Sequence, residues 1–157
     1  MKMIKWLEQW EMSSLKINVK FLEMEWAPKR ADQSAAWELY IELLTRVSTQ
    51  YLQPEHGDEK TALESIHVLF SLTREIMKRY NRDCQDFAKI AIPVLNQIIR
   101  PFTAKWHRLA IGGAFSDQDQ CQLFRIELIE LQQQLRRYTG MLGDMAGVED
   151  FSALELE

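Results

Sequence analysis

The sequence predicts an all-α fold, an up-and-down bundle of four to five helices with one long C-terminal helix. Apolar residues recur at spacings of three and four over several long stretches, as they do in amphipathic helices. Capping residues and prolines mark where these stretches begin and end. The chain has 157 residues, 46% of them hydrophobic and 27% charged, which is enough for one globular core that needs neither disulfide nor metal.

We predict a single helical domain over residues 1–157, made of three parts. An N-terminal helix and an extended segment occupy residues 1–31, the helical bundle occupies 32–146, and an acidic tail occupies 147–157. Pro28 and the residues KRAD after it are the one plausible linker in the chain. The division rests on composition and on the pattern of apolar residues.

The N-terminal part is the least regular. Residues 3–12 predict a short helix. In residues 15–26 apolar side chains alternate with Lys16, Asn18 and Lys20, which favours a strand, although the same residues fit a helix almost as well. No second strand is predicted in the chain, so a strand here would need a partner from another copy or another protein.

The middle of the chain predicts two helices that begin at aspartate caps. Asp32 caps a helix that runs to about Tyr51, and Asp58 caps a helix that runs to about Tyr80. The apolar residues on each follow one stripe, so each helix is expected to bury one face.

A third helix is predicted over residues 83–99, followed by a short one. Pro93 lies inside the third helix and should kink it, because proline lacks the N–H that would bond to the carbonyl of Lys89. Pro101 is then expected to start the short helix at its first position.

The clearest helix is predicted over residues 117–146. Ser116 and Asp119 resemble a capping box at its start, and Gly140 and Gly143 should weaken its last turns. Its apolar seam has no gap; it consists of Cys121, Phe124, Leu128, Leu131, Leu135, Tyr138, Leu142 and Met145.

Composition indicates a cytoplasmic protein without cofactors. The sequence contains only two cysteines, Cys84 and Cys121, and no CxxC spacing. The N-terminus has no apolar signal-peptide region, and no run of eighteen apolar residues occurs, so we expect no membrane span. Motifs for nucleophilic, nucleotide-dependent or zinc-dependent catalysis are missing, so we do not expect an enzyme.

Charge is distributed unevenly. Residues 74–108 carry 8 basic and 3 acidic groups, whereas residues 109–157 carry 3 basic and 9 acidic groups. The first interpretation is that the two segments match each other or are simply solvated; the alternatives are an anion or nucleic-acid site and an acidic protein partner. The candidate interaction residues are Trp26, Arg74, Lys78, Arg82, Arg100, Lys105, Trp106 and Arg108.

The stretch RPFTAKWHRLAIGGAF, residues 100–115, combines these basic residues with aromatic ones. On a helix, Phe102 and Trp106 share one side, which favours a core position for both; the alternative leaves Trp106 half exposed beside a cation. His107, next to Arg108, should be harder to protonate than an isolated histidine.

One weak metal motif is present. Glu64 and His67 are spaced as in the ExxH pair of carboxylate-bridged di-iron bundles. Such a site needs a second ExxH, which the sequence lacks, so we favour Glu64 and His67 as surface neighbours.

These observations rank three functions. The first is a non-enzymatic protein-interaction module, an adaptor or regulatory subunit that binds another protein or a second copy of itself. The second is binding of nucleic acid or a phosphate-containing ligand through residues 74–108. The third is a carboxylate-bridged metal-binding bundle.

Overall fold

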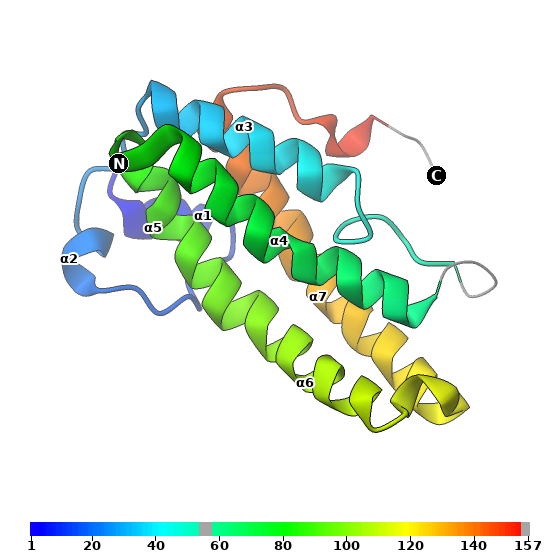
Figure 1. Ribbon diagram of the computed structural model, residues 1–157. Coiled ribbons are helices and arrows are strands. Elements are labelled where there is room, and N and C mark those ends of the chain that lie inside the picture. The colour runs from blue at the N-terminus through cyan, green and yellow to red at the C-terminus, as the bar shows by residue number, and fades with distance from the viewer. Residues whose placement is uncertain (54–57, 155–157) are drawn as a thin grey trace.

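The computed structural model describes residues 1–53 and 58–154, and this part of the chain is all-α (Figure 1). The three longest helices are α3, α4 and α7, and shorter helices precede, connect and follow them. The α-helices are α1 (Met3–Gln9), α2 (Val19–Leu22), α3 (Arg30–Leu44), α4 (Glu59–Tyr80), α5 (Gln85–Val94), α6 (Arg100–Ile111) and α7 (Gln118–Ala146).

Neighbouring long helices run side by side (Figure 1). α7 packs most extensively against α3, while α4 contacts both α3 and α6. The N-terminal helix α1 contacts the C-terminal end of α7, where the indole Nε1 of Trp6 donates a 2.7 Å hydrogen bond to Asp144. Among the described residues, no helix combines the length and the apolar character needed to cross a membrane.

α7 has the predicted seam and nearly the predicted ends. The seam residues from Phe124 to Met145 are buried, and only Cys121 is half-buried. The cap is Asp117 instead of Ser116, because the Asp117 carboxylate accepts a hydrogen bond from the N–H of Asp119. The helix therefore forms as its apolar spacing predicts, with an aspartate cap one residue later.

The two glycines near the end of α7 are sites of close helix contact. A Cβ atom at Gly140 would lie 2.5 Å from the ring of Trp10, and one at Gly143 would lie 3.1 Å from the ring of Tyr40. The rings of Trp10 and Tyr40 therefore pack directly on the α7 backbone, which a larger side chain at either glycine would prevent.

α3 is shorter than predicted and ends at Leu44 instead of Tyr51. Its last carbonyl groups are satisfied by side chains of the following loop instead of by further helical N–H groups. Hydroxyl groups of Ser48 and Thr49 donate to the carbonyl of Leu43, and the Gln50 amide donates to that of Leu44.

The predicted break before the short helix is absent. α5 continues through a π-helical turn (Leu95–Ile99) into α6, so residues 85–111 form one continuous helical segment. Arg100 N–H donates to the Leu95 carbonyl, five residues earlier. This wider turn accommodates Pro101, whose ring would clash with the carbonyl four residues before it in a regular α-helix.

The predicted N-terminal strand is not confirmed. Among the described residues, the segment 15–26 contains the short helix α2 and only a single antiparallel bridge between Lys2 and Glu25. Two backbone hydrogen bonds flank this bridge, from Met3 N–H to the Met24 carbonyl and from Trp26 N–H to the Met1 carbonyl. The segment therefore pairs with the N-terminus itself.

Candidate protein-binding groove

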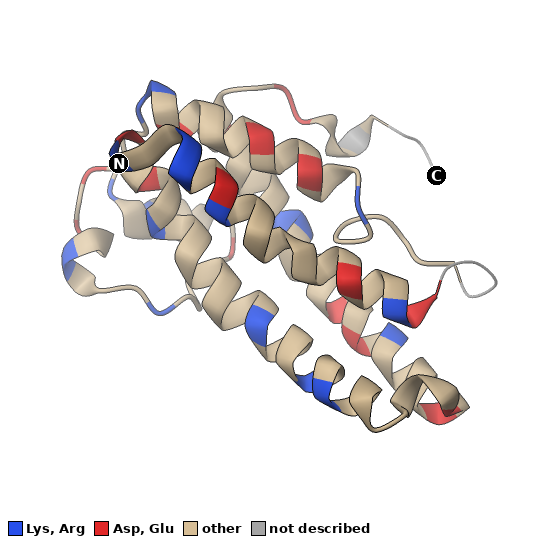
Figure 2. Ribbon diagram, in the orientation of Figure 1, with Lys and Arg blue, Asp and Glu red and all other residues tan. Residues whose placement is uncertain are grey.

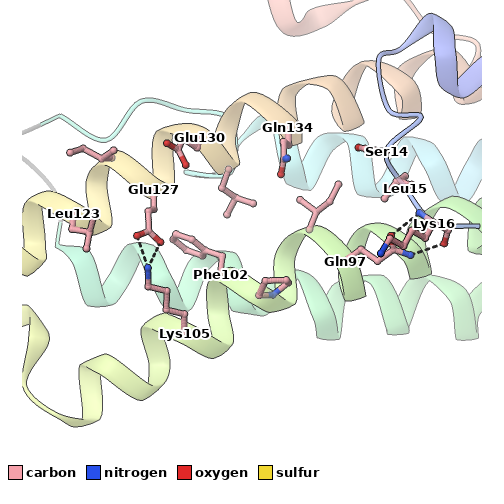
Figure 3. Close-up of a pocket in the computed structure, with 14 residues that line it drawn as sticks. Ser14, Leu15, Lys16, Gln97, Phe102, Lys105, Leu123, Glu127, Glu130 and Gln134 are labelled. Atoms are coloured by element: carbon pink, nitrogen blue, oxygen red, sulfur yellow. Dashed lines mark hydrogen bonds and ion pairs between the residues drawn. The ribbon is translucent and has the colours of Figure 1, made fainter.

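A groove of about 910 Å³ lies between α6 and α7 (Figure 3). The π turn before α6 and the loop at residues 14–16 extend its lining. Apolar and polar side chains share its surface: Leu15, Ile98, Pro101, Phe102, Leu123, Ile126 and Leu131 are apolar, and Ser14, Lys16, Gln97, Lys105, Glu127, Glu130 and Gln134 are polar.

An apolar ridge on α7, formed by Leu123, Ile126 and Ile129, borders the groove, and its first two residues line the groove itself. These side chains are 39%, 56% and 43% exposed. Their spacing of three residues places them along one side of the helix, beside the buried seam. A smaller hollow of about 200 Å³ lies on the other flank of the ridge and is lined by Tyr51 and Leu52. The ridge therefore stands between two hollows.

A carboxylate joins the two walls of the groove. Glu127 of α7 accepts a hydrogen bond from the Lys105 ammonium at 2.6 Å (Figure 3). It also accepts one from the Trp106 indole N–H at 3.2 Å. The ammonium also lies 5.3 Å from the centre of the Trp106 ring. A half-buried carboxylate with two donors on one helix fixes the separation of α6 and α7 at this point.

The loop at residues 14–16 lines the groove next to the π turn and is held there by Gln97. The Gln97 amide accepts a hydrogen bond from Lys16 N–H and donates one to the Lys16 carbonyl, both at 2.8 Å. Leu15 next to it is buried. One glutamine side chain thus holds a loop that is far from it in the sequence.

The predicted aromatic residues occupy different places. Trp106 is fully buried, at 0% exposed, and lies against Phe115 and Phe124, the core position that the sequence favoured. Trp26 is half-buried and stacks on Trp6, with ring centres 4.6 Å apart. Trp26 does not line the groove.

The predicted basic residues lie on two helices and on the turn after α4. α6 carries Arg100, Lys105 and Arg108 and no acidic residue (Figure 2). Lys105 is the one basic residue of segment 74–108 that pairs with a carboxylate of the described acidic C-terminal third. Within the residues that the structure describes, five members of the predicted set form no salt bridge: Arg74, Lys78, Arg82, Arg100 and Arg108.

His67, the histidine of the ExxH motif, lies beside a second histidine, His107. The ring of His67 on α4 lies 4.8 Å from the ring of His107 on α6. Burial and the neighbouring His67 lower the pKa of His107, and the Glu64 carboxylate opposes this shift. Across residues 1–53 and 58–154, no group of three or more histidine, cysteine or acidic side chains is arranged to hold a metal ion.

The sequence interpretation missed three side chains of α7 that position the loop beside the small hollow. The buried Gln132 amide donates to the carbonyls of Val47 and Gln50 at 2.6 and 2.8 Å. The guanidinium groups of Arg136 and Arg125 donate to the carbonyls of Thr49 and Gln53. The ridge was missed as well, although Leu123, Ile126 and Ile129 recur every three residues next to the seam, a pattern that the sequence shows.

Comparisons of the chain with protein-family models, with curated proteins and with solved structures find no match.

Proposed function

We propose that this chain is a non-enzymatic, cytoplasmic protein-interaction module, an adaptor or regulatory subunit built as an up-and-down helical bundle. Its binding surface is the ridge formed by Leu123, Ile126 and Ile129 together with the groove beside it. The observation that carries the proposal is the exposure of three large aliphatic side chains in a row, 39%, 56% and 43%, on one side of α7.

Isolated exposed aliphatic residues are ordinary, but a contiguous row beside a groove is typical of a surface that a partner covers. The groove runs between two helices, so an amphipathic segment of a partner protein fits it in the helix-in-groove manner. Lys16, Glu130 and Gln134 line the groove as well and supply the polar contacts that commonly surround an apolar interface.

A matched pair of substitutions tests this proposal. Ile126→Lys places a charge on the ridge, and Ile92→Lys places one on α5 at a residue of similar exposure, 46% against 56%. Copurification from the native host and light scattering then compare the bound partner or dimer. We expect Ile126→Lys to lose at least about 90% of the complex, since a buried unpaired charge is strongly unfavourable, and Ile92→Lys to keep it.

Two results would count against the proposal. One is a strict monomer that recovers no partner. The other is a complex that both lysine variants weaken equally, because the ridge would then have no special part in it.

A second candidate function rests on the five basic residues without a salt bridge in the described structure. We propose as the alternative that they bind nucleic acid or another polyanion. Binding through phosphates would weaken steeply with salt. Fluorescence anisotropy with labelled DNA and RNA at several salt concentrations tests this; absent or salt-independent binding removes the candidate.

A further inference from the structure

Two of the chain's three histidines meet between α4 and α6. The ring centres of His67 and His107 are 4.8 Å apart, with the ring planes at 84°. His67 is exposed and His107 is half-buried, so the pair is open to solvent. The neighbouring ring of Phe70, 5.6 Å from His67, packs against it on the same helix. The pair is separate from the α6–α7 groove.

The ring separation of 4.8 Å, which is also that of an ordinary edge-to-face contact, falls in the range that two imidazoles span when they bind a single metal ion. A metal–nitrogen bond of about 2.1 Å places each ring centre about 3.2 Å from the ion. Two such rings at about 90–110° around the ion lie about 4.5–5.2 Å apart. The direction in which each ring nitrogen points depends on the torsion about Cβ–Cγ, which is the least restricted torsion of histidine.

Glu64 favours a cation at this pair, whereas Arg108, next to His107 in the sequence, opposes one. Glu64 lies one turn before His67 on α4 and acts electrostatically on His107. Burial and the neighbouring ring lower the pKa of His107, which favours its neutral form. The neutral form is the one that offers a lone pair to a metal.

We propose that His67 and His107 form a two-histidine site for a divalent transition ion that prefers imidazole, such as Zn²⁺ or Ni²⁺, with water in the other positions. The bound ion clamps α4 to α6. This site differs from a carboxylate-bridged bundle, because its ligands are two imidazoles from different helices. It is independent of the partner-binding function proposed above.

Titration of the full chain, freed of metal with a chelator and then dialysed, tests the proposal. Calorimetry with ZnCl₂ or NiCl₂ should give one ion per chain. A thermal scan should show a rise in Tm of about 5–10 °C at a free ion concentration of about 100 times Kd. In histidine-selective NMR spectra the signals of His67 and His107 should shift together, whereas MgCl₂, a hard cation that prefers oxygen ligands, should have no effect.

Variants separate this site from other metal ligands. His67→Gln and His107→Gln should each abolish the rise in Tm, while His56→Gln and Cys121→Ser, which remove the third histidine and the less buried thiol, should keep it. Circular dichroism establishes that each variant folds. An undiminished rise in Tm in both His67→Gln and His107→Gln would overturn the proposal, as would unshifted signals of both rings in the wild-type protein.

Discussion

Asp32 and Phe87 join the first turns of two helices that are distant in sequence. One oxygen of the Asp32 carboxylate accepts the Phe87 N–H of α5 at 2.9 Å, and the other accepts the Lys29 N–H at the start of α3 at 2.8 Å. The aspartate is 1% exposed. Contrary to the expectation from sequence, Asp32 lies inside the first turn of α3 instead of preceding it, and it satisfies N–H groups at both helix starts.

Removing this carboxylate should therefore cost more than removing an ordinary cap. We expect Asp32→Ala to lower the free energy of unfolding by about 2–4 kcal/mol, because a buried donor is left unsatisfied and a cap is lost. Asp58→Ala, at the exposed cap of α4, should cost about 1 kcal/mol. Urea denaturation measures both; equal losses would show that the link to Phe87 contributes nothing.

Gly140→Ala should destabilise the protein although alanine is the better helix former. The new Cβ would lie 2.5 Å from the ring of Trp10, and the overpacking should outweigh the gain in helix propensity of about 1 kcal/mol. Gly112→Ala meets nothing closer than a carbonyl oxygen at 3.5 Å and serves as the control. Thermal unfolding should show a lower Tm for Gly140→Ala alone. A Trp10→Ala background should remove the difference, since it removes the obstacle.

Gln132 should control the order of the loop at residues 45–53. Gln132→Leu removes both hydrogen bonds to loop carbonyls, at an expected cost of about 1–3 kcal/mol. Gln133→Leu changes the exposed neighbour and should be close to neutral. Hydrogen exchange followed by mass spectrometry should show faster exchange in this loop for Gln132→Leu only. Unchanged exchange would mean that Arg136 and Arg125 suffice to hold the loop.

His107 should titrate below the usual histidine value of about 6.5. Burial is the largest cause of its lowered pKa and the neighbouring His67 is the second. Because the unfolded chain then binds the proton more readily, the contribution of His107 to stability should decrease as the pH falls below about 6.5. NMR titration with a chelator present measures the pKa. His67→Gln should raise it and Glu64→Gln should lower it further; the opposite order would contradict this account.

Local patterns were sufficient to predict α7 and the start of α4. The stripe from Phe124 to Met145 predicted α7, and Asp58 marked the start of α4, because periodicity and capping depend on residues close in sequence. The end of α3 was missed because it depends on contacts that form only when the following loop folds. Side chains of Ser48, Thr49 and Gln50 end the helix, and their choice of carbonyls depends on how the loop folds back.

The candidate site depended on contacts that no local pattern contains. Glu127 meets Lys105 across the groove, and Gln97 holds Lys16, each through the packing of elements distant in sequence. The meeting of His67 with His107 depends likewise on the alignment of α4 with α6. Pro101 misled in another way: it suggested the start of a separate helix, but the π turn before it joins α5 to α6 without a break.

The two hydrogen bonds between Gln97 and the backbone of Lys16 hold the loop at residues 14–16 in the lining of the groove. In the proposed mode of binding, a docked helix would therefore contact this loop as well as the walls formed by α6 and α7, and the loop would contribute to the register in which the helix is held.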